Sequence, residues 1–212
     1  MSDRPLFERL VHDLKGPLSP LQTAAYLLRR PELPEERRVE LAETIERQSR
    51  RMAGMIEELG DWARANEGRL VHRRRPVEVR MLMDLAVGAV PGCATDPDLA
   101  PALEEAHVEG DESRLVQALA SLLGYAQWRA GAPPVLHAWR EADRVLIEVS
   151  DTADAAENPA TLFTDPRPEP YDLGLGLRLI VADAIIRAHH GELTAHALAP
   201  GLAIRIDLPL AP

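Results

Sequence analysis

The sequence predicts an α+β protein in which an N-terminal helical hairpin is followed by an α/β sandwich. In two long stretches, 3–30 and 35–66, apolar residues recur every three or four positions, which is the spacing of amphipathic helices. After residue 68 short alternating segments typical of strands are mixed with further helical segments. This order predicts helices on one face of a mixed sheet, and two domains over 1–67 and 68–212.

The first helical stretch is interrupted by proline. Pro17 and Pro20 lie inside its apolar pattern, and proline removes a backbone donor and clashes with the preceding turn. We therefore expect a kink just after His12. Pro31 and Pro34 then end this stretch and frame a short loop before the second one.

The second helical stretch carries an apolar stripe that resembles a coiled-coil heptad over about three repeats. The stripe consists of Leu41, Ile45, Met52, Met55, Ile56, Leu59 and Trp62. One hairpin buries little apolar surface by itself, so the pairing of two chains into a four-helix bundle is the simplest arrangement. The stripe thus predicts a homodimer, and it indicates no chemistry.

The rest of the chain divides into shorter elements. We expect strands at 70–79, 107–109, 135–139, 145–149, 193–198 and 202–208. We expect helices at 81–90, 111–129 and 175–189. Residues 152–172 are rich in Asp, Ala and Pro, and they predict an irregular connection.

Composition excludes several classes of function. The formal net charge of −10 argues against nucleic acid as a partner, because a phosphate backbone needs a basic surface. Cys93 is the only cysteine, which excludes a disulfide framework and a thiolate metal cluster, and no histidine pair has zinc-ligand spacing. No apolar run reaches the roughly 18 residues of a membrane span, and no signal peptide is evident. We therefore expect a cytoplasmic protein with no membrane contact.

The residues best suited to chemistry lie near the N-terminus. His12 is followed directly by Asp13 on a predicted amphipathic helix. An imidazole is partly neutral near neutral pH, so one ring nitrogen is free to attack, and the adjacent carboxylate can hold the proton of the other. For a His-Asp pair taken alone, the simpler explanation is a solvated histidine beside a solvated acid.

Other segments of the chain, taken in order, support a reactive His12 over a merely solvated one. The segments are His12-Asp13-Leu14-Lys15-Gly16-Pro17-Leu18, Asp111-x-x-Arg114-Leu115-x-Gln117, Asp151 at a strand end, Leu173-Gly174-Leu175-Gly176-Leu177 and His190-Gly191-Glu192-Leu193. In this order and spacing the chain resembles the catalytic core of the two-component histidine kinases, from about residue 6 to residue 209.

The resemblance implies a site and its partners. It implies a dimeric four-helix bundle that carries His12 as phosphoacceptor and Asp13 as its acid/base partner. It implies an α/β domain that binds ATP, with Asp151 on the adenine amino group and with Gly174 and Gly176 near the phosphates. The aspartate that receives the phosphoryl group would belong to a response-regulator receiver domain.

The chain departs from the family at the nucleotide site. The family has asparagines where this chain has Ser121 and Tyr125, and the second of them is the family's Mg²⁺ ligand. A phenol is a bulky and poor ligand for Mg²⁺. Trp128 replaces a basic residue, and the run 152–155 lacks two expected glycines. Asp154 and Asp172 are candidate substitutes for the metal ligand, although their spacing does not single them out.

Three functions remain open at this point. In the first, the chain is a phosphotransfer protein whose autophosphorylation is weak or lost, and His12 receives its phosphoryl group from a receiver domain or from an upstream kinase. In the second, it is a working histidine kinase that uses ATP and Mg²⁺. In the third, it is a regulatory scaffold without phosphoryl chemistry.

Overall fold

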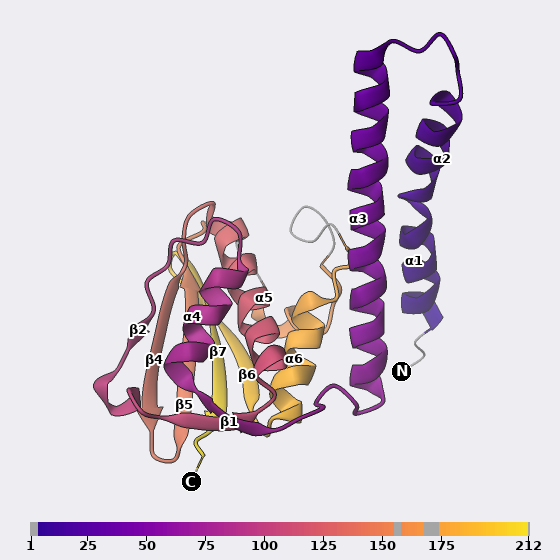
Figure 1. Ribbon diagram of the computed structural model, residues 1–212. Helices are drawn as coiled ribbons and strands as arrows, with labels where there is room; N and C mark the ends of the chain where they lie inside the picture. The colour runs from indigo at the N-terminus through magenta and orange to yellow at the C-terminus, as the bar shows by residue number, and fades with distance from the viewer. Residues whose placement is uncertain (1–3, 155–157, 168–173, 212) are drawn as a thin grey trace. The chain divides into compact units, whose positions relative to one another are not determined.

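The computed structural model describes residues 4–154, 158–167 and 174–211 (Figure 1). The chain divides into two compact units, Met1–Gly60 with Pro168–Gly176, and Asp61–Arg167 with Leu177–Pro212. The first unit contains the helical hairpin, and the second contains a sheet with three α-helices after the last turns of the long helix. The predicted α+β fold, a hairpin followed by an α/β domain, is confirmed.

The hairpin is built from three helices, α1 (Arg4–Lys15), α2 (Leu18–Leu27) and α3 (Glu35–Asn66). Helices α1 and α2 together form one arm, and α3 forms the other (Figure 1). The predicted kink is a complete break, because the Gly16 N–H turns back to the Asp13 carbonyl at 3.1 Å and Pro17 has no N–H to continue the ladder. The break places His12 in the last turn of α1.

An arginine holds the loop between the two arms. The Arg38 guanidinium donates to the carbonyl oxygens of Leu33 and Arg30, each at 3.2 Å. These carbonyl oxygens lie beyond the end of a helix, where no backbone N–H is available to them, and the guanidinium supplies the missing donors. The loop therefore returns the chain to α3 over a few residues, as the proline pair predicted.

The second unit is a mixed sheet with helices on one face (Figure 1). The strands are β1 (Arg75–Glu78), β2 (Asp98–Leu99), β3 (His107–Gly110), β4 (Val135–Glu141), β5 (Arg144–Asp151), β6 (Glu192–Leu198) and β7 (Gly201–Pro209). The helices are α4 (Val79–Ala89), α5 (Glu112–Ala130) and α6 (Arg178–Ala188), with short 3₁₀ turns at Pro101–Leu103 and Pro159–Thr161. The main sheet has the order β2-β4-β5-β7-β6, and β1 pairs with β3 separately. Only the β2–β4 pairing in the main sheet is parallel.

The core lies between the central strands and α5. Alternate residues of β5 and β7 are buried together with one stripe of α5, namely Val145, Ile147, Val149, Ile204, Ile206, Leu115, Leu119 and Leu122. Each fully buried side chain of this size contributes about 1.5–3 kcal/mol of hydrophobic stabilisation. The end of β5, where Asp151 lies, is therefore paired with β7 at the edge of this buried core.

The predicted strand at 70–79 is wrong in its first half. Strand β1 begins only at Arg75, because the backbone N–H groups of His72 and Arg73 donate to the Asp111 carboxylate at 3.1 and 3.4 Å. A side chain, and not a neighbouring strand, satisfies these two donors. Composition alone could not show this competition.

The predicted helix at 175–189 also begins late. Helix α6 starts at Arg178, because Gly176 has a φ of +77°, a left-handed conformation that interrupts a right-handed helix. The two-residue strand β2 was not predicted, since an element this short carries no alternation. Within the described part of the chain, no helix combines the length and apolar character that crossing a membrane requires.

Candidate functional site

His12 is highly exposed at the end of α1. Its Nδ1 lies 3.2 Å from Oδ1 of Asp13, and the two side chains are 88% and 30% exposed. An imidazole whose Nδ1–H is donated to a carboxylate presents Nε2 as the basic nitrogen. The contact therefore orients the ring so that Nε2 is available for attack on a group that arrives from solvent.

The Asp13 carboxylate has a second charged neighbour. Arg9, one helical turn earlier, approaches Oδ2 of Asp13 at 3.6 Å. An exposed ion pair of this kind adds little stability, but it is a second contact that positions the carboxylate beside the ring. A Cβ at Gly16 would lie 3.2 Å from the Asp13 carbonyl oxygen, so glycine suits the tight turn that ends α1.

Asp151, the predicted adenine residue, is buried at the end of β5. Its Oδ2 accepts from Nε of Arg129 at 2.9 Å, and its Oδ1 accepts from the backbone N–H of Ala153 at 2.9 Å. The side chains of Arg129 and Asp151 are 3% and 1% exposed. The carboxylate is thus occupied by the chain itself.

The last turns of α5 pack around this ion pair. Tyr125 is 1% exposed, and the Arg129 guanidinium carbon lies 5.9 Å from the centre of its ring. Trp128 packs on the same ring at 6.0 Å between centroids. Burial by itself would lower the pKa of Arg129, but hydrogen bonds and charge from Asp151 and Tyr125 raise it, so the guanidinium stays charged.

Ser121, the other residue in place of an asparagine, turns to its own helix. Its hydroxyl donates to the Gln117 carbonyl oxygen at 2.8 Å, one turn earlier in α5. Neither a buried phenol nor such a hydroxyl offers the oxygen ligands that Mg²⁺ prefers. The residues at these positions do not fit a magnesium–nucleotide complex. Asp154 is exposed, and Ala155 and Asp172 lie outside the described residues.

The glycine segment before α6 is held by a carboxylate. Gly174 and Gly176 flank Leu175, whose backbone N–H donates to Oε2 of Glu58 at 3.0 Å. Backbone amides ahead of a helix are suited to bind phosphate. Here one of these amides already binds an anionic group of the chain, a contact across 117 residues that sequence spacing could not have found.

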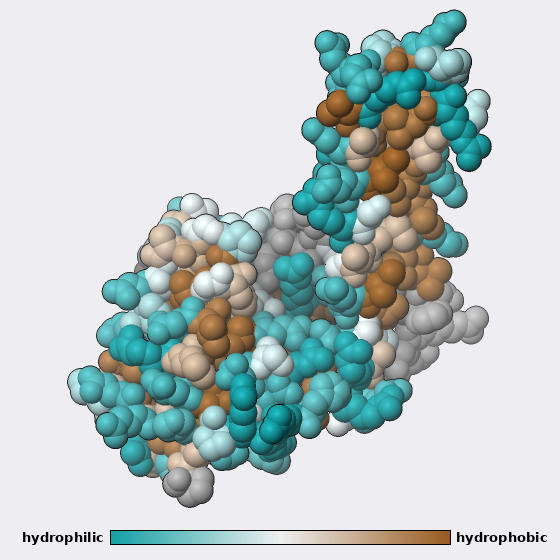
Figure 2. All heavy atoms as spheres, in the orientation of Figure 1, coloured by the Kyte–Doolittle hydropathy of each residue, from teal (hydrophilic) through white to brown (hydrophobic). Residues whose placement is uncertain are grey.

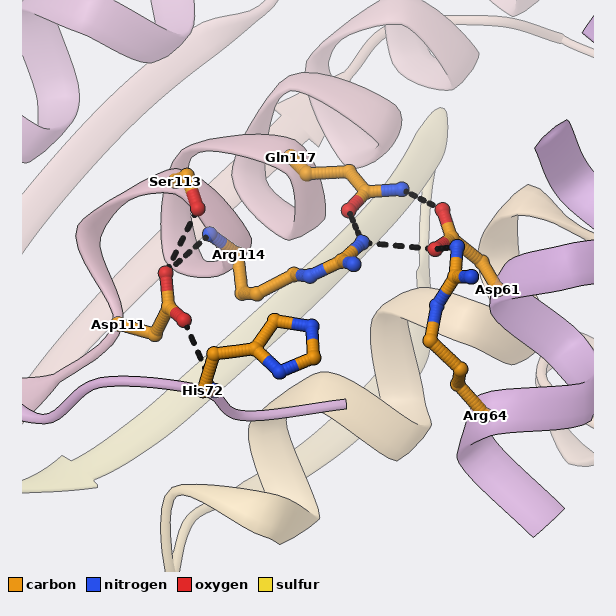
Figure 3. A network of polar contacts seen from close by, with 7 residues as sticks. All are labelled: Asp61, Arg64, His72, Asp111, Ser113, Arg114 and Gln117. Atoms are coloured by element: carbon orange, nitrogen blue, oxygen red, sulfur yellow. Dashed lines mark hydrogen bonds and ion pairs between the residues drawn. The ribbon is translucent and has the colours of Figure 1, made fainter. Parts of the chain in front are cut away.

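The segment that begins with Asp111 takes part in a polar network at the start of α5 (Figure 3). Asp111 caps α5, and its Oδ1 accepts from the Ser113 hydroxyl at 2.7 Å. Burial would raise the pKa of Asp111, but hydrogen bonds from Ser113 and from the backbone of His72, Arg73 and Arg114 lower it to about 2. The segment therefore has a structural role, which is to start α5.

The same network reaches the last turns of α3. Oδ1 of Asp61 accepts from Arg64 at 2.7 Å and from Arg114 at 2.8 Å, while Oδ2 accepts from Gln117 at 2.7 Å. Burial opposes ionisation of Asp61, but these hydrogen bonds lower its pKa. Arg114 also donates to Gln117 at 2.8 Å (Figure 3). The cluster ties the end of α3 to α5 within the second unit.

A buried histidine lies behind the cap of α5. Nε2 of His189 accepts from the Asp111 backbone N–H at 2.9 Å, and its Nδ1 lies 2.7 Å from the Ile185 carbonyl oxygen. Only the neutral ring with its proton on Nδ1 satisfies both contacts. Burial, the largest influence, lowers the pKa of His189. Its contacts are structural, unlike those of the exposed His12.

Comparison with known proteins agrees with this arrangement. Residues 4–68 match the His Kinase A (phospho-acceptor) domain family. Over 95% of its length the chain is 27% identical to a bacteriophytochrome of Pseudomonas aeruginosa, and it covers 29% of that protein. It is 29% identical over 94% of its length to the sensor histidine kinase TrcS of Mycobacterium tuberculosis, of which it covers 42%. It is 26% identical over 97% to the sensory histidine kinase/phosphatase NtrB of Rhodobacter capsulatus, of which it covers 61%.

Solved structures share the fold. The histidine kinase AdeS of Acinetobacter baumannii superposes with a TM-score of 0.75 and 17% identity, over 95% of this chain and 98% of that one. Full-length ShkA in complex with AMPPNP superposes with a TM-score of 0.66 and 22% identity, over 96% of this chain and 46% of that one.

Fold and matches together define the class of protein, a helical hairpin of the phosphoacceptor type followed by an ATPase-like α/β domain. Residues 4–68 thus match a phosphoacceptor domain of histidine kinases, and over almost its whole length the chain is similar to sensor histidine kinases. It spans between 29% and 61% of the length of the curated relatives it matches.

Proposed function

We propose that this chain is a phosphotransfer protein, which carries a phosphoryl group on His12 and exchanges it with an aspartate of a response-regulator receiver domain. In this proposal ATP-dependent autophosphorylation is weak or lost. The observation that carries it is the 88% exposure of the His12 ring beside Asp13. A ring so placed can meet a phosphoryl group presented by another protein.

The transfer itself needs only residues of the hairpin. Nε2 of His12 attacks the phosphorus of the receiver's acyl phosphate, a P–N bond forms, and the P–O bond to the receiver carboxylate breaks. The ring becomes a phosphorylated imidazolium, and the Asp13 carboxylate stabilises the positive charge through Nδ1–H. The receiver aspartate leaves as a carboxylate, and the same steps in reverse return the phosphoryl group.

The α/β domain supports the second half of the proposal. Asp151 is paired with Arg129, Tyr125 is buried at the position of the family's metal ligand, and the Leu175 amide is bonded to Glu58. Phosphoryl transfer from ATP depends on a metal ion and on donors that position the phosphates. Three of the groups expected to serve a nucleotide are thus replaced or already engaged.

The hairpin also favours a homodimer. Figure 2 shows apolar surface along the hairpin. The exposed large hydrophobic residues of its helices are Val11, Leu18, Tyr26, Val39 and Ile56. Exposed apolar stripes of this kind are typical of helices that pack against a partner. We propose that residues 1–67 dimerise and accept the phosphoryl group, and that residues 68–212 form the ATP-binding-like domain.

A side-by-side labelling assay tests the function. The chain is incubated with receiver domains that were phosphorylated with radiolabelled acetyl phosphate, and in parallel with γ-labelled ATP and Mg²⁺. We expect base-stable, acid-labile label from a phosphorylated receiver on the wild type and on His196→Ala, an exposed histidine of β6. We expect none on His12→Ala, and little label from ATP on any variant.

Two results would contradict the proposal. Label from ATP that disappears in His12→Ala and Asp151→Ala would establish a working kinase. No label from any receiver or from ATP, on a folded dimer, would leave a regulatory scaffold.

A further inference from the structure

We propose that Arg129 acts as an internal substitute for the adenine amino group on Asp151, and that its guanidinium excludes adenine nucleotides from the α/β domain. This inference rests on the proposed function and deepens it, because it names the residue that closes the nucleotide site. The argument needs only the contacts of the last turns of α5 and the end of β5.

The Asp151 carboxylate has no oxygen left to face a ligand without rearrangement. Oδ2 accepts from Arg129 at 2.9 Å and Oδ1 accepts from the Ala153 N–H at 2.9 Å, and the whole side chain is 1% exposed. Each carboxylate oxygen has a further lone pair, but Arg129, at 3% exposure, covers the carboxylate. A base that donates an amino group to Asp151 must therefore first displace the guanidinium.

The exchange is unfavourable for the ligand. The bond from Arg129 to Asp151 joins two charged groups, whereas the amino group of adenine is neutral, and charge-assisted hydrogen bonds are roughly twice as strong as neutral ones. Displacement would also separate two charged side chains that are paired in buried surroundings. Adenine thus offers less than the contact that it would replace.

Neighbouring aromatic residues oppose any movement of the guanidinium. The buried Tyr125 ring lies against it at 5.9 Å, and Trp128 packs on that ring. Arg129 is therefore held by Asp151 on β5 and by an aromatic side chain on its own helix. Since Tyr125 also stands where the resemblance places the metal ligand, one packed cluster removes both the base site and the metal site.

Adenosine binding tests this inference without any phosphoryl chemistry. Adenosine is added up to about 5 mM, in the range of weak ligands, and binding is followed by saturation-transfer NMR and calorimetry. We expect no saturable binding by the wild type. In Arg129→Ala we expect binding at least about tenfold tighter than this limit, because Oδ2 of the buried Asp151 carboxylate loses its donor and gains one from the base.

Further variants test whether the new binding depends on the Asp151 carboxylate. The double variant Arg129→Ala/Asp151→Asn should lose it, and Arg140→Ala, an exposed arginine of β4, should behave like the wild type. If circular dichroism shows that Arg129→Ala does not fold, Arg129→Gln replaces it, since a neutral amide still fills the space beside Tyr125. The same gain is expected there, and a folded Gln variant without it would overturn the inference.

Saturable adenosine binding by the wild type that Asp151→Asn abolishes would also overturn it, as would a folded Arg129→Ala that does not bind. The proposed function is tested separately, because transfer from a phosphorylated receiver to His12 should be equal in the wild type and in Arg129→Ala. Loss of that transfer in both would refute the phosphotransfer function and leave the adenosine results unchanged.

Discussion

Two nitrogen–carboxylate pairs in this chain have similar chemistry and opposite surroundings. His12 and Asp13 meet at 3.2 Å on an exposed helix end, whereas Arg129 and Asp151 meet at 2.9 Å in the core of the α/β domain. The solvent-exposed His12–Asp13 contact breaks at little energetic cost, so the ring of His12 can take part in a reaction. In the core, separating the Arg129 and Asp151 charges is costly, so the closed contact is strongly favoured. Exposure, more than residue type, separates a reactive pair from a closed one.

Breaking the two pairs should give the largest difference. Asp151→Ala removes the buried carboxylate that pairs with the Arg129 guanidinium, and we expect the free energy of unfolding to fall by about 3–5 kcal/mol. In Asp13→Ala only exposed contacts are lost, and a change within about 0.5 kcal/mol is expected. Urea denaturation followed by circular dichroism measures both. Equal losses in the two variants would refute the comparison.

The exposed pair should instead control a rate. In Asp13→Asn the side chain can no longer stabilise the positive charge on the phosphorylated ring, and we expect transfer to His12 to slow by about 100-fold. Asp84→Asn, which removes an exposed carboxylate of α4, should leave the rate unchanged. Rapid-quench measurements with a phosphorylated receiver give both rates. An unchanged rate in Asp13→Asn would restrict Asp13 to a structural role.

Asp111 adds an intermediate case, a buried carboxylate held by hydrogen bonds. Its pKa is lowered from 3.8 to about 2 in the folded chain, so the unfolded chain binds the proton more readily. The resulting stability, roughly 2 kcal/mol, is complete above the unfolded pKa and is lost as pH falls from about 4 toward 2.

Asp111→Asn separates this effect from the titration of other carboxylates. Asparagine still caps a helix but does not titrate in this range. The difference in free energy of unfolding between the wild type and Asp111→Asn should therefore shrink as pH falls through this interval, as measured by urea unfolding at each pH. A difference that stays constant would mean that Asp111 titrates normally.

The smallest effect on stability is expected from the buried His189 near neutral pH. Burial lowers the pKa of His189, with Arg74 and His190 acting in the same direction and Asp111 opposing. The unfolded chain then binds protons more readily, so stability declines as pH falls through the unfolded value of 6.5. His189→Gln should reduce this decline, as urea midpoints at about pH 7.5 and about pH 5.5 measure.

Ring titrations by NMR complete the test. The His189 signals should remain those of the neutral ring at pH values below the ordinary histidine pKa of 6.5. A His189 ring that protonates at or above pH 6.5 would contradict this prediction. His107→Ala, which removes an exposed histidine, identifies the signals of that ring and serves as the control.

The sequence carried most of the fold. The three- and four-residue spacing predicted the hairpin, Pro17 predicted the break after His12, and alternation predicted the paired strands around β5 and β7. It failed at 70–74, where backbone donors bind Asp111 from far along the chain, and at the start of α6, where Gly176 has a positive φ. Local patterns do not contain either cause.

By itself the sequence determined where the chemistry could lie: an imidazole next to a carboxylate at a helix end, and an aspartate that closes a strand. Only the tertiary structure decided which of these carboxylates is exposed to solvent and which is buried against a partner. Arg129 lies 22 residues before Asp151, and Glu58 lies 117 residues before Leu175. Pairings over such distances depend on packing, and packing sets both the burial of a charge and the partner that balances it.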